Sequence, residues 1–306
     1  MKPYLYSLSL VLISILLVIL IPLFISTLDQ TLTAPLIPEN NPQVLSVQKI
    51  NIPPMSKNKP FPQILARAIL IKDLSTDTIL YQKDISLPLP PASITKVMTA
   101  LVASEYFKPN SPLTIKTSIN IPGSNVGLKQ GETLSFRSLL YGMLLPSGND
   151  AAFAIAENYP GGAVGFVSAM NKKAAELNLQ NTHFDNPAGF DNPNHYSSAK
   201  DLAKITQEAL KSPQLARIFA TKQTDIVSLD KKYEHRLYNL NKLLSQIPGV
   251  MGIKTGKTEA AKENLITLVE RDGHKVLYVL LGSDDRFGET TLIIDWAYSN
   301  FEWTGT

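Results

Sequence analysis

The chain has 306 residues, a formal net charge of +3, 44% hydrophobic residues and 18% charged residues. This composition supports a packed core and excludes a disordered chain, and so slight a positive charge gives no reason to expect a nucleic-acid-binding protein. The sequence contains no cysteine, which excludes disulfides, thiolate metal sites, a cysteine nucleophile and a lipidated cysteine. Its length allows one large domain or two small ones.

Residues 1–28 are predicted to be a transmembrane anchor. The run from Tyr4 to Ile25 is overwhelmingly apolar and uncharged, and as a helix with a rise of about 1.5 Å per residue it would reach ~33 Å, enough to cross a bilayer core. A cleaved signal peptide is the alternative, although its apolar core usually spans only about 7–15 residues. Lys2 before the run and Asp29 after it favour a cytoplasmic N-terminus, with the rest of the chain outside the cytoplasm.

Residues 29–61 are predicted to be an extended linker. Seven prolines lie between residues 31 and 62, with Asn and Gln among them. Proline-rich segments of this kind act as semi-rigid spacers. We therefore expect the linker to hold a globular domain, residues 62–306, away from the membrane.

The globular part is predicted to be a single α+β domain. Residues 66–84 indicate two strands around a turn at 75–77, and residues 113–121 alternate like a strand. Apolar residues recur at helical spacing in five later or intervening segments: 93–107, 135–145, 150–159, 164–179 and 198–210. A strand–Asp-Gly–strand pattern covers 264–283, and a helix at 288–301 closes the chain. Strands near both ends indicate a sheet assembled from distant segments.

The first candidate for chemistry is the segment Ser93-Ile-Thr-Lys96. Ser-x-x-Lys is a weak pattern alone, because the chain holds four other copies, beginning at Ser46, Ser56, Ser197 and Ser228. Two of these copies fall in the linker, one is expected at a turn, and Ser197 is expected to cap a helix. Ser93 instead begins an apolar helix that can be buried, and residues three apart share a helical face. Burial lowers the pKa of a lysine, and only the neutral amine can take a serine proton. A helix cap is the alternative interpretation of Ser93.

The second candidate is Ser147-Gly148-Asn149, which lies between two helical segments. One interpretation is a helix cap, with Pro146 and Gly148 making the turn. The functional interpretation is a hydroxyl that relays protons and an amide that binds a substrate backbone. The competing Ser-x-Asn copy at Ser118 falls within a strand-like segment.

The third candidate is Lys254-Thr255-Gly256, within the stretch GIKTGKT. The stretch resembles the end of a phosphate-binding loop, but that pattern needs a glycine at position 251, where the chain has Met. It also lies between strand-like segments, whereas a phosphate-binding loop opens a helix. A solvated Lys-Thr turn before a hairpin is the simpler alternative.

Together, Ser-x-x-Lys, Ser-x-Asn and Lys-Thr-Gly in this order are the signature of penicillin-binding proteins and serine β-lactamases. The surrounding segments, including PASITKVMTALVA and LLYGMLLPSGNDAAFAIAE, closely resemble the D-alanyl-D-alanine carboxypeptidases, the low-molecular-mass penicillin-binding proteins of serine peptidase family S11. The resemblance spans about residues 62–302. It implies a transpeptidase-like fold, with an antiparallel sheet flanked by helices and a helical subdomain.

The resemblance implies a serine acyl-transfer enzyme that removes the terminal D-Ala from peptidoglycan stem peptides and is acylated by β-lactams. Ser93 would be the nucleophile that attacks the carbonyl of the penultimate D-Ala, and Lys96 would be the general base. Ser147 would pass the proton to the departing D-Ala, and Asn149 would contact the peptide. The family chemistry implies no metal and no cofactor.

The resemblance also assigns the substrate contacts. Lys254 and Thr255 would bind the terminal carboxylate, and the charge of Lys254 would help to keep Lys96 neutral. Backbone N–H groups of Ser93 and Lys257, the residue after the Lys-Thr-Gly motif, would form the oxyanion hole, in which the loss of one donor costs about 3 kcal/mol.

Three features depart from the family pattern or are ambiguous. Arg286 matches a family position near the carboxylate site, but a surface ion pair is a rival interpretation. Family members often carry an aromatic or small residue at Lys257, and commonly glycine plus an aromatic near Lys262 and Glu263, so substrate reach on that edge is open. Many relatives carry a C-terminal β-rich domain and an amphipathic anchoring helix. The segment after Lys254 is expected to be too short for either of them. The apolar N-terminal run is therefore expected to anchor the protein instead.

Two related enzymes use the same motifs. A D,D-endopeptidase would use the same residues on cross-linked peptidoglycan, because the position of cleavage depends on the shape of the cleft. A class A β-lactamase needs a glutamate in Glu-x-x-Leu-Asn, whereas here Glu176, Leu177 and Asn178 are contiguous.

Two further classes remain as alternatives. A zinc hydrolase could draw on the acidic and histidine residues near position 190, which are His183, Asp185, Asp191 and His195. Their spacing matches no standard zinc motif, and the Asn-Pro and Pro-Ala-Gly segments indicate turns. His235 and His274 are expected at the surface. A membrane-tethered wall-binding protein without activity is the last alternative, which no feature of the sequence favours.

Overall fold

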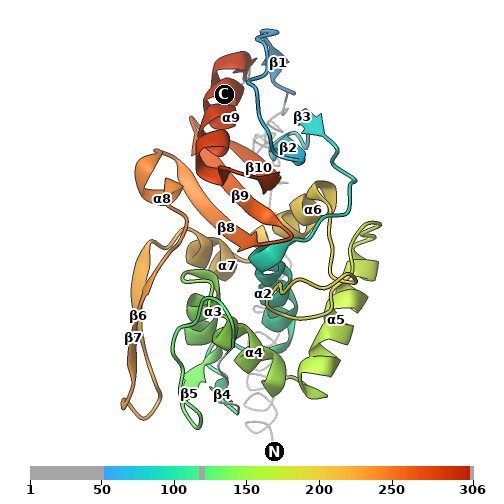
Figure 1. The fold of residues 1–306 in the computed structure, drawn as a ribbon. Helices are drawn as coiled ribbons and strands as arrows, with labels where there is room; N and C mark the ends of the chain where they lie inside the picture. The colour runs from blue at the N-terminus through green and yellow to red at the C-terminus, as the bar shows by residue number, and fades with distance from the viewer. Residues whose placement is uncertain (1–51, 117–120, 304–306) are drawn as a thin grey trace, which may run out of the picture. The chain divides into compact units, whose positions relative to one another are not determined.

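The computed structural model describes residues 52–116 and 121–303 (Figure 1). The predicted anchor, most of the predicted linker and Ser118 lie outside the described residues. Within the described ranges, no helix is both long and apolar enough to cross a membrane. The anchor and the linker boundaries therefore stay predictions.

A five-stranded antiparallel sheet, in the order β3-β2-β10-β9-β8, forms the centre of the fold. Its strands are β2 (Ala68–Asp73), β3 (Ile79–Lys83), β8 (Val250–Thr258), β9 (Lys262–Arg271) and β10 (His274–Ser283). The two early strands join the three late ones where β2 pairs with β10, for example Leu70 with Val279. This confirms the predicted α+β sheet built from distant segments, and it leaves β8 at one edge.

Alternate residues of the central strands face opposite layers of helices, because successive side chains of a strand point to opposite faces. On one face the strands pack against α9 (Arg286–Asn300), through Tyr278 of β10 and Ile294 of α9 among others. On the other face Leu277 and Val279 join the larger core with α2 (Lys96–Tyr106) and α6 (Ala199–Leu210). The buried helix α2 therefore lies on the same side of the sheet as α6, within this larger core.

The remaining helices gather around α2, below the sheet in the view of Figure 1. They are α3 (Phe136–Leu144), α4 (Asn149–Asn158), α5 (Gly162–Glu176) and α7 (Pro213–Phe219). A single 3-10 turn, η1 (Ala92–Thr95), leads straight into α2. The structure thus confirms a helix in each of the predicted helical segments, and it shows α7 and the short α8 (Leu243–Gln246) in addition.

Short elements complete the described fold. These are β1 (Met55–Ser56), β4 (Pro112–Thr114), β5 (Thr133–Ser135), β6 (Gln223–Val227), β7 (Glu234–Tyr238), α8 (Leu243–Gln246) and β11 (Phe301–Glu302). Strand β1 pairs with β11, and the Trp296 indole donates to the carbonyl of Lys59, so residues 55–61 run along the end of the domain.

Three sequence predictions are corrected by the structure. The strand found in the predicted segment 113–121 ends at Thr114, after which Ile115 makes two backbone hydrogen bonds, to Glu132 and from Gly131, in the turn before β5. Helix α6 is capped by Ser198, not Ser197, because Ser197 is buried and its hydroxyl pairs with Thr182.

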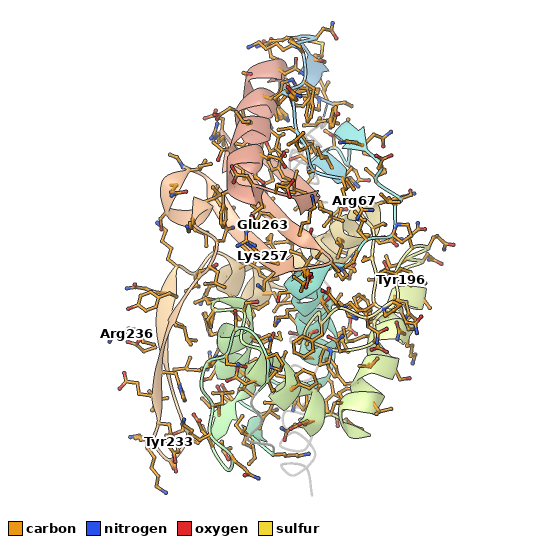
Figure 2. The ribbon with its side chains drawn as sticks, in the orientation of Figure 1. Arg67, Tyr196, Tyr233, Arg236, Lys257 and Glu263 are labelled. Carbon is orange, nitrogen blue, oxygen red and sulfur yellow. The ribbon has the colours of Figure 1, made fainter. Side chains whose placement is uncertain are left out.

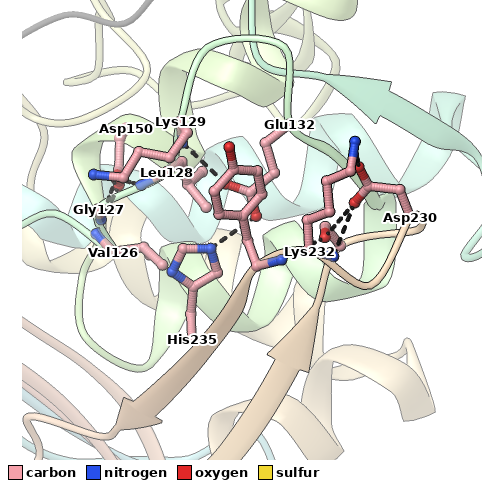
Figure 3. Close-up of polar contacts among 11 residues, drawn as sticks. Val126, Gly127, Leu128, Lys129, Glu132, Asp150, Asp230, Lys232 and His235 are labelled. Atoms are coloured by element: carbon pink, nitrogen blue, oxygen red, sulfur yellow. Dashed lines mark hydrogen bonds and ion pairs between the residues drawn. The ribbon is translucent and has the colours of Figure 1, made fainter.

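His235 is the third correction, because its side chain is only 11% exposed. Its Nε2 lies 2.7 Å from the buried carboxylate of Glu132, a contact that ties the β6–β7 hairpin to the loop before β5 (Figure 3). His274 is partly buried and stacks on Trp303.

Candidate active site

The edge strand β8 meets the turn η1, and this contact brings the first and third sequence motifs together. A Cβ atom on Gly256 would lie only 3.1 Å from the backbone nitrogen of Ser93 and from the carbonyl oxygen of Pro91. That separation is tighter than ordinary packing, so a side chain here would push the strand away. The absence of a side chain at Gly256 therefore lets the Lys-Thr-Gly strand lie against the turn that carries Ser93.

Ser93 and Lys96 lie on one face of the helix start, as their spacing predicts. The Ser93 hydroxyl is partly exposed, whereas Lys96 is completely buried beneath it. Their Oγ and Nζ atoms are 3.0 Å apart. Ala92, immediately before the serine, has a φ of 49°, a left-handed conformation that non-glycine residues adopt at a cost of about 1–3 kcal/mol.

The amine of Lys96 has two fixed acceptors besides Ser93. Its Nζ lies 2.7 Å from Oδ1 of Asn149 and 2.7 Å from the carbonyl oxygen of Ala188. The Asn149 amide is oriented by its Nδ2, which donates to the carbonyl of Pro122 at 2.6 Å. A neutral amine has two N–H groups and one lone pair, so once both N–H groups are used, the lone pair faces the Ser93 hydroxyl.

Burial and charge favour this neutral amine. Burial lowers the pKa of Lys96 well below its usual range, and the positive charge of Lys254 lowers it further, against an opposing effect of Asp150. Burial, helped by the Arg286 guanidinium, lowers the pKa of Lys254 to about 7. Two buried lysines therefore share the site, and burial favours the neutral form of both.

The second motif lies on the other side of the same site. Lys254 Nζ donates to Ser147 Oγ at 2.9 Å and to its neighbouring carbonyl at Thr255, also at 2.9 Å. Ser147 is buried and has a φ of 63°, in the left-handed region, directly before α4. The turn Ser147-Gly148-Asn149 thus presents a hydroxyl to one lysine and an amide to the other.

Asp150, which was not predicted as a site residue, fixes the loop at 126–128 next to this turn. Its carboxylate accepts the backbone N–H groups of Val126, Gly127 and Leu128 at 2.9, 2.8 and 3.1 Å (Figure 3). Such charge-assisted bonds are stronger than neutral ones. Asp150 lies in the first turn of α4, where the positive end of the helix dipole stabilises an acidic side chain. This position is the feature of the sequence that could have identified it.

The outer rim of the site is formed by the β8–β9 pair and the start of α9. Arg286 Nη1 donates to the Gly256 carbonyl at 2.9 Å, and its Nε lies 3.9 Å from Glu263. The exposed side chain of Lys257 pairs with Glu263 at 3.0 Å; both residues are labelled in Figure 2. Arg286 therefore lies at the Lys-Thr-Gly strand and also near an acidic residue, so both interpretations of it have a structural basis.

The candidate zinc ligands lie in and next to the loop that packs against the start of α2. His195 uses Nδ1 to accept the backbone N–H of Asp185, and Asp191 accepts the hydroxyl of Thr258 at 2.7 Å. Among the residues that the structure describes, no three His, Asp or Glu side chains converge as metal ligands would. The loop instead supplies the Ala188 carbonyl to Lys96, a contact that sequence patterns do not reveal because every residue has a carbonyl.

The chain is similar to known proteins over most of the described domain. The family model described as D-alanyl-D-alanine carboxypeptidase matches residues 54–285. The chain belongs to peptidase family S11. It is therefore a serine peptidase by family, as its motif order had implied.

Similar S11 relatives cover the described domain. D-alanyl-D-alanine carboxypeptidase DacF of Bacillus subtilis is 35% identical over 78% of this chain, which spans 63% of that relative's length. DacB2 of Mycobacterium tuberculosis is 32% identical over 78% of this chain and 84% of its own. The crystal structure of the Streptomyces K15 DD-transpeptidase is 31% identical, with a TM-score of 0.74 over 79% of this chain and 100% of that one.

Proposed function

We propose that this S11 peptidase is a serine-type D-Ala-D-Ala carboxypeptidase that works through an acyl-enzyme on Ser93. The observation that carries the proposal is the pair of acceptors around Lys96. Asn149 Oδ1 and the Ala188 carbonyl occupy both N–H groups of a neutral amine and leave its lone pair toward the Ser93 hydroxyl. A serine in contact with a neutral buried amine is the arrangement that activates a hydroxyl nucleophile.

The proposed acylation step begins with transfer of the Ser93 proton to Lys96 Nζ. Oγ then attacks the carbonyl carbon of the penultimate D-Ala, and the negative charge that develops on the carbonyl oxygen is held by the backbone N–H groups of Ser93 and Lys257. The C–N bond to the terminal D-Ala breaks as its nitrogen takes the proton of the Ser147 hydroxyl. The proton held by Lys96 then replaces it on Ser147, which leaves Lys96 neutral for the next step. Water then attacks the ester, with Lys96 again taking the proton, and releases the shortened peptide.

The terminal carboxylate of the substrate is proposed to bind near Lys254 and Thr255. Lys254 carries a positive charge below about pH 7, and Arg286 adds a second charge at the adjacent carbonyl of Gly256. Two cations beside an edge strand favour an extended peptide that ends in a carboxylate. β-Lactams, which carry a carboxylate next to a reactive amide, would acylate the same serine.

A D,D-endopeptidase is the second candidate. A relative from Pseudomonas aeruginosa named D-alanyl-D-alanine endopeptidase is 32% identical over 79% of this chain and 79% of its own length. The acyl half of the reaction is the same, and only the departing amine differs. Substrate comparison therefore separates the two functions.

The test uses native protein, Ser93→Ala and the matched control Ser56→Ala, which alters an exposed copy of Ser-x-x-Lys. Each is incubated with a fluorescent penicillin, with a stem pentapeptide and with cross-linked muropeptides. Native protein and Ser56→Ala should be labelled and should release D-alanine, whereas Ser93→Ala should do neither. Native protein that neither labels nor releases D-alanine would refute the enzymatic proposal. Equal labelling of Ser93→Ala would refute the nucleophile, and rapid penicillin turnover would indicate a β-lactamase.

We also propose that residues 1–28 anchor the protein in the cell membrane, with the catalytic domain outside the cytoplasm. The uncharged apolar run at 4–25 supports this proposal. Full-length protein should stay in the membrane fraction after alkaline extraction, and protein that lacks residues 1–28 should not. A secreted product that begins after this segment would instead indicate a cleaved signal.

A further inference from the structure

The loop at 185–195 contacts the catalytic helix at more than one point. Besides the Ala188 carbonyl that accepts from Lys96, the Pro187 carbonyl accepts the Thr99 hydroxyl at 2.7 Å. Gly189 lies so close to the turn η1 that a Cβ atom on it would be 1.9 Å from the Ala92 carbonyl oxygen. The position of this loop therefore decides where one of the two acceptors of Lys96 lies.

His195 joins this loop to the segment that carries the nucleophile. Its side chain is buried, its Nδ1 lies 3.0 Å from the backbone nitrogen of Asp185, and its Nε2 lies 2.7 Å from Oγ1 of Thr95. A backbone N–H can only donate, so Nδ1 must be the acceptor in this pair. In the neutral ring the hydrogen is then on Nε2, which donates to Thr95, the residue immediately before Lys96.

We propose that His195 is a positioning residue for the acyl-transfer reaction. By holding Thr95 on one ring nitrogen and the Asp185 N–H on the other, it fixes the separation between the Ala188 carbonyl and Lys96 Nζ. If this separation grows, one N–H group of the amine is released, and the lone pair no longer has to face the Ser93 hydroxyl. The inference rests on the proposed function, because it concerns the same serine.

The surroundings of His195 keep the ring neutral over the physiological range. Burial lowers its pKa to about 4; the neighbouring Asp185 and Asp191 oppose this shift, and His183 and Lys96 add to it. Protonation would place a hydrogen on Nδ1, where it would meet the N–H of Asp185. The hydrogen bonds that join the loop to the helix through His195 should therefore hold above about pH 4 and weaken below it.

Single substitutions separate the two contacts. Thr95→Val removes the hydroxyl that Nε2 contacts, and Thr95→Ser keeps a hydroxyl there. His195→Asn retains an acceptor close to the position of Nδ1 but cannot reach Thr95. Thr206→Val is the matched control, because Thr206 is equally buried and its hydroxyl donates to a carbonyl within α6. All variants are made in the full-length protein.

The measurements are the second-order rate constant for acylation by a fluorescent penicillin, from about pH 5 to about pH 9, and the melting temperature. Thr95→Val and His195→Asn should acylate at least about 10-fold more slowly, since small errors in catalytic geometry are costly. The acid limb of their profiles should move to higher pH, because water that enters a loosened site raises the pKa of Lys96. Thr95→Ser should recover most of the rate, and Thr206→Val should keep the native rate and profile.

Several outcomes would overturn the inference. One is a native rate and an unshifted profile in Thr95→Val and His195→Asn, even if their melting temperatures fall. Another is an equal loss in Thr206→Val, which would assign the effect to general destabilisation. If His195→Asn does not fold, the comparison of Thr95→Val with Thr95→Ser decides. A native protein that is not acylated at all would instead refute the proposed function.

Discussion

Lys254 Nζ lies 2.9 Å from Ser147 Oγ, although the two residues are 107 positions apart in the chain. The contact joins the edge strand of the sheet to the turn before α4. Both residues are buried, so their bond is shielded from water and is stronger than it would be at the surface. A proton that leaves or reaches Ser147 therefore moves beside an amine whose own charge state changes near neutral pH.

Replacement of Lys96 by Met should abolish the base without changing the length of the side chain greatly. We expect the rate of acylation by penicillin to fall by about 10²–10⁴-fold, the usual contribution of a positioned acid or base. The contrasting substitution is Lys257→Met, at a lysine whose side chain is 66% exposed, and it should acylate at a near-native rate. A Lys96→Met protein that folds and acylates normally would exclude Lys96 as the base.

The affinity for the substrate carboxylate should depend on pH through Lys254. Because its pKa is lowered to about 7, the amine is charged below that pH and becomes neutral above it, so the KM for a D-Ala-D-Ala peptide should rise as pH passes 7. A peptide whose terminal carboxylate is amidated supplies the control, since its binding should lack this dependence. The same pH dependence for both peptides would remove Lys254 from carboxylate binding.

Gly256→Ala should disturb the contact between β8 and η1. The added methyl group would meet Ala92 Cβ and Ser93 N at 3.1 Å, and the strand would have to move by a few tenths of an ångström. We expect acylation to slow by about 10–100-fold, with only a small loss of stability. Lys257→Ala, one residue along the same strand, retains its backbone N–H and should stay close to native. Equal rates for Gly256→Ala and native protein would show that the close approach is not needed.

Asp150→Asn should lower the free energy of unfolding by about 2–3 kcal/mol, because the carboxylate that accepts four backbone N–H groups loses its charge. Chemical denaturation measures this change. Asp225→Asn serves as the comparison, since its ion pair with Arg236 is exposed and such pairs contribute at most about 1 kcal/mol. Similar losses in both variants would contradict the special role of Asp150.

Much of the fold was predictable because its elements have strong local patterns. The Asp-Gly turn between two apolar runs predicted the β9–β10 hairpin, and the spacing of apolar residues predicted the buried helix α2. The β6–β7 hairpin was not predicted, because its strands are short and mostly exposed, with a single buried residue each.

The residues of the candidate site likewise fall into those that the sequence predicts and those that it does not. Ser93, Lys96 and Lys254 were found because their side chains carry recognisable chemistry at a recognisable spacing. The Ala188 carbonyl could not be found, since a backbone acceptor leaves no mark in residue type. His195 was noticed for the wrong chemistry: its imidazole suggested a metal, whereas the structure commits both ring nitrogens to hydrogen bonds.

The pairing of β2 with β10 has a consequence for how the protein is made. Ser93 is synthesised early, but the strand that carries Lys254 is placed by β9 and β10, and the sheet joins the early strands only through β10. Contacts of such high sequence separation form late and slowly. The contact between the turn that carries Ser93 and the Lys-Thr-Gly strand is therefore expected to form only after the last strands of the sheet have been made.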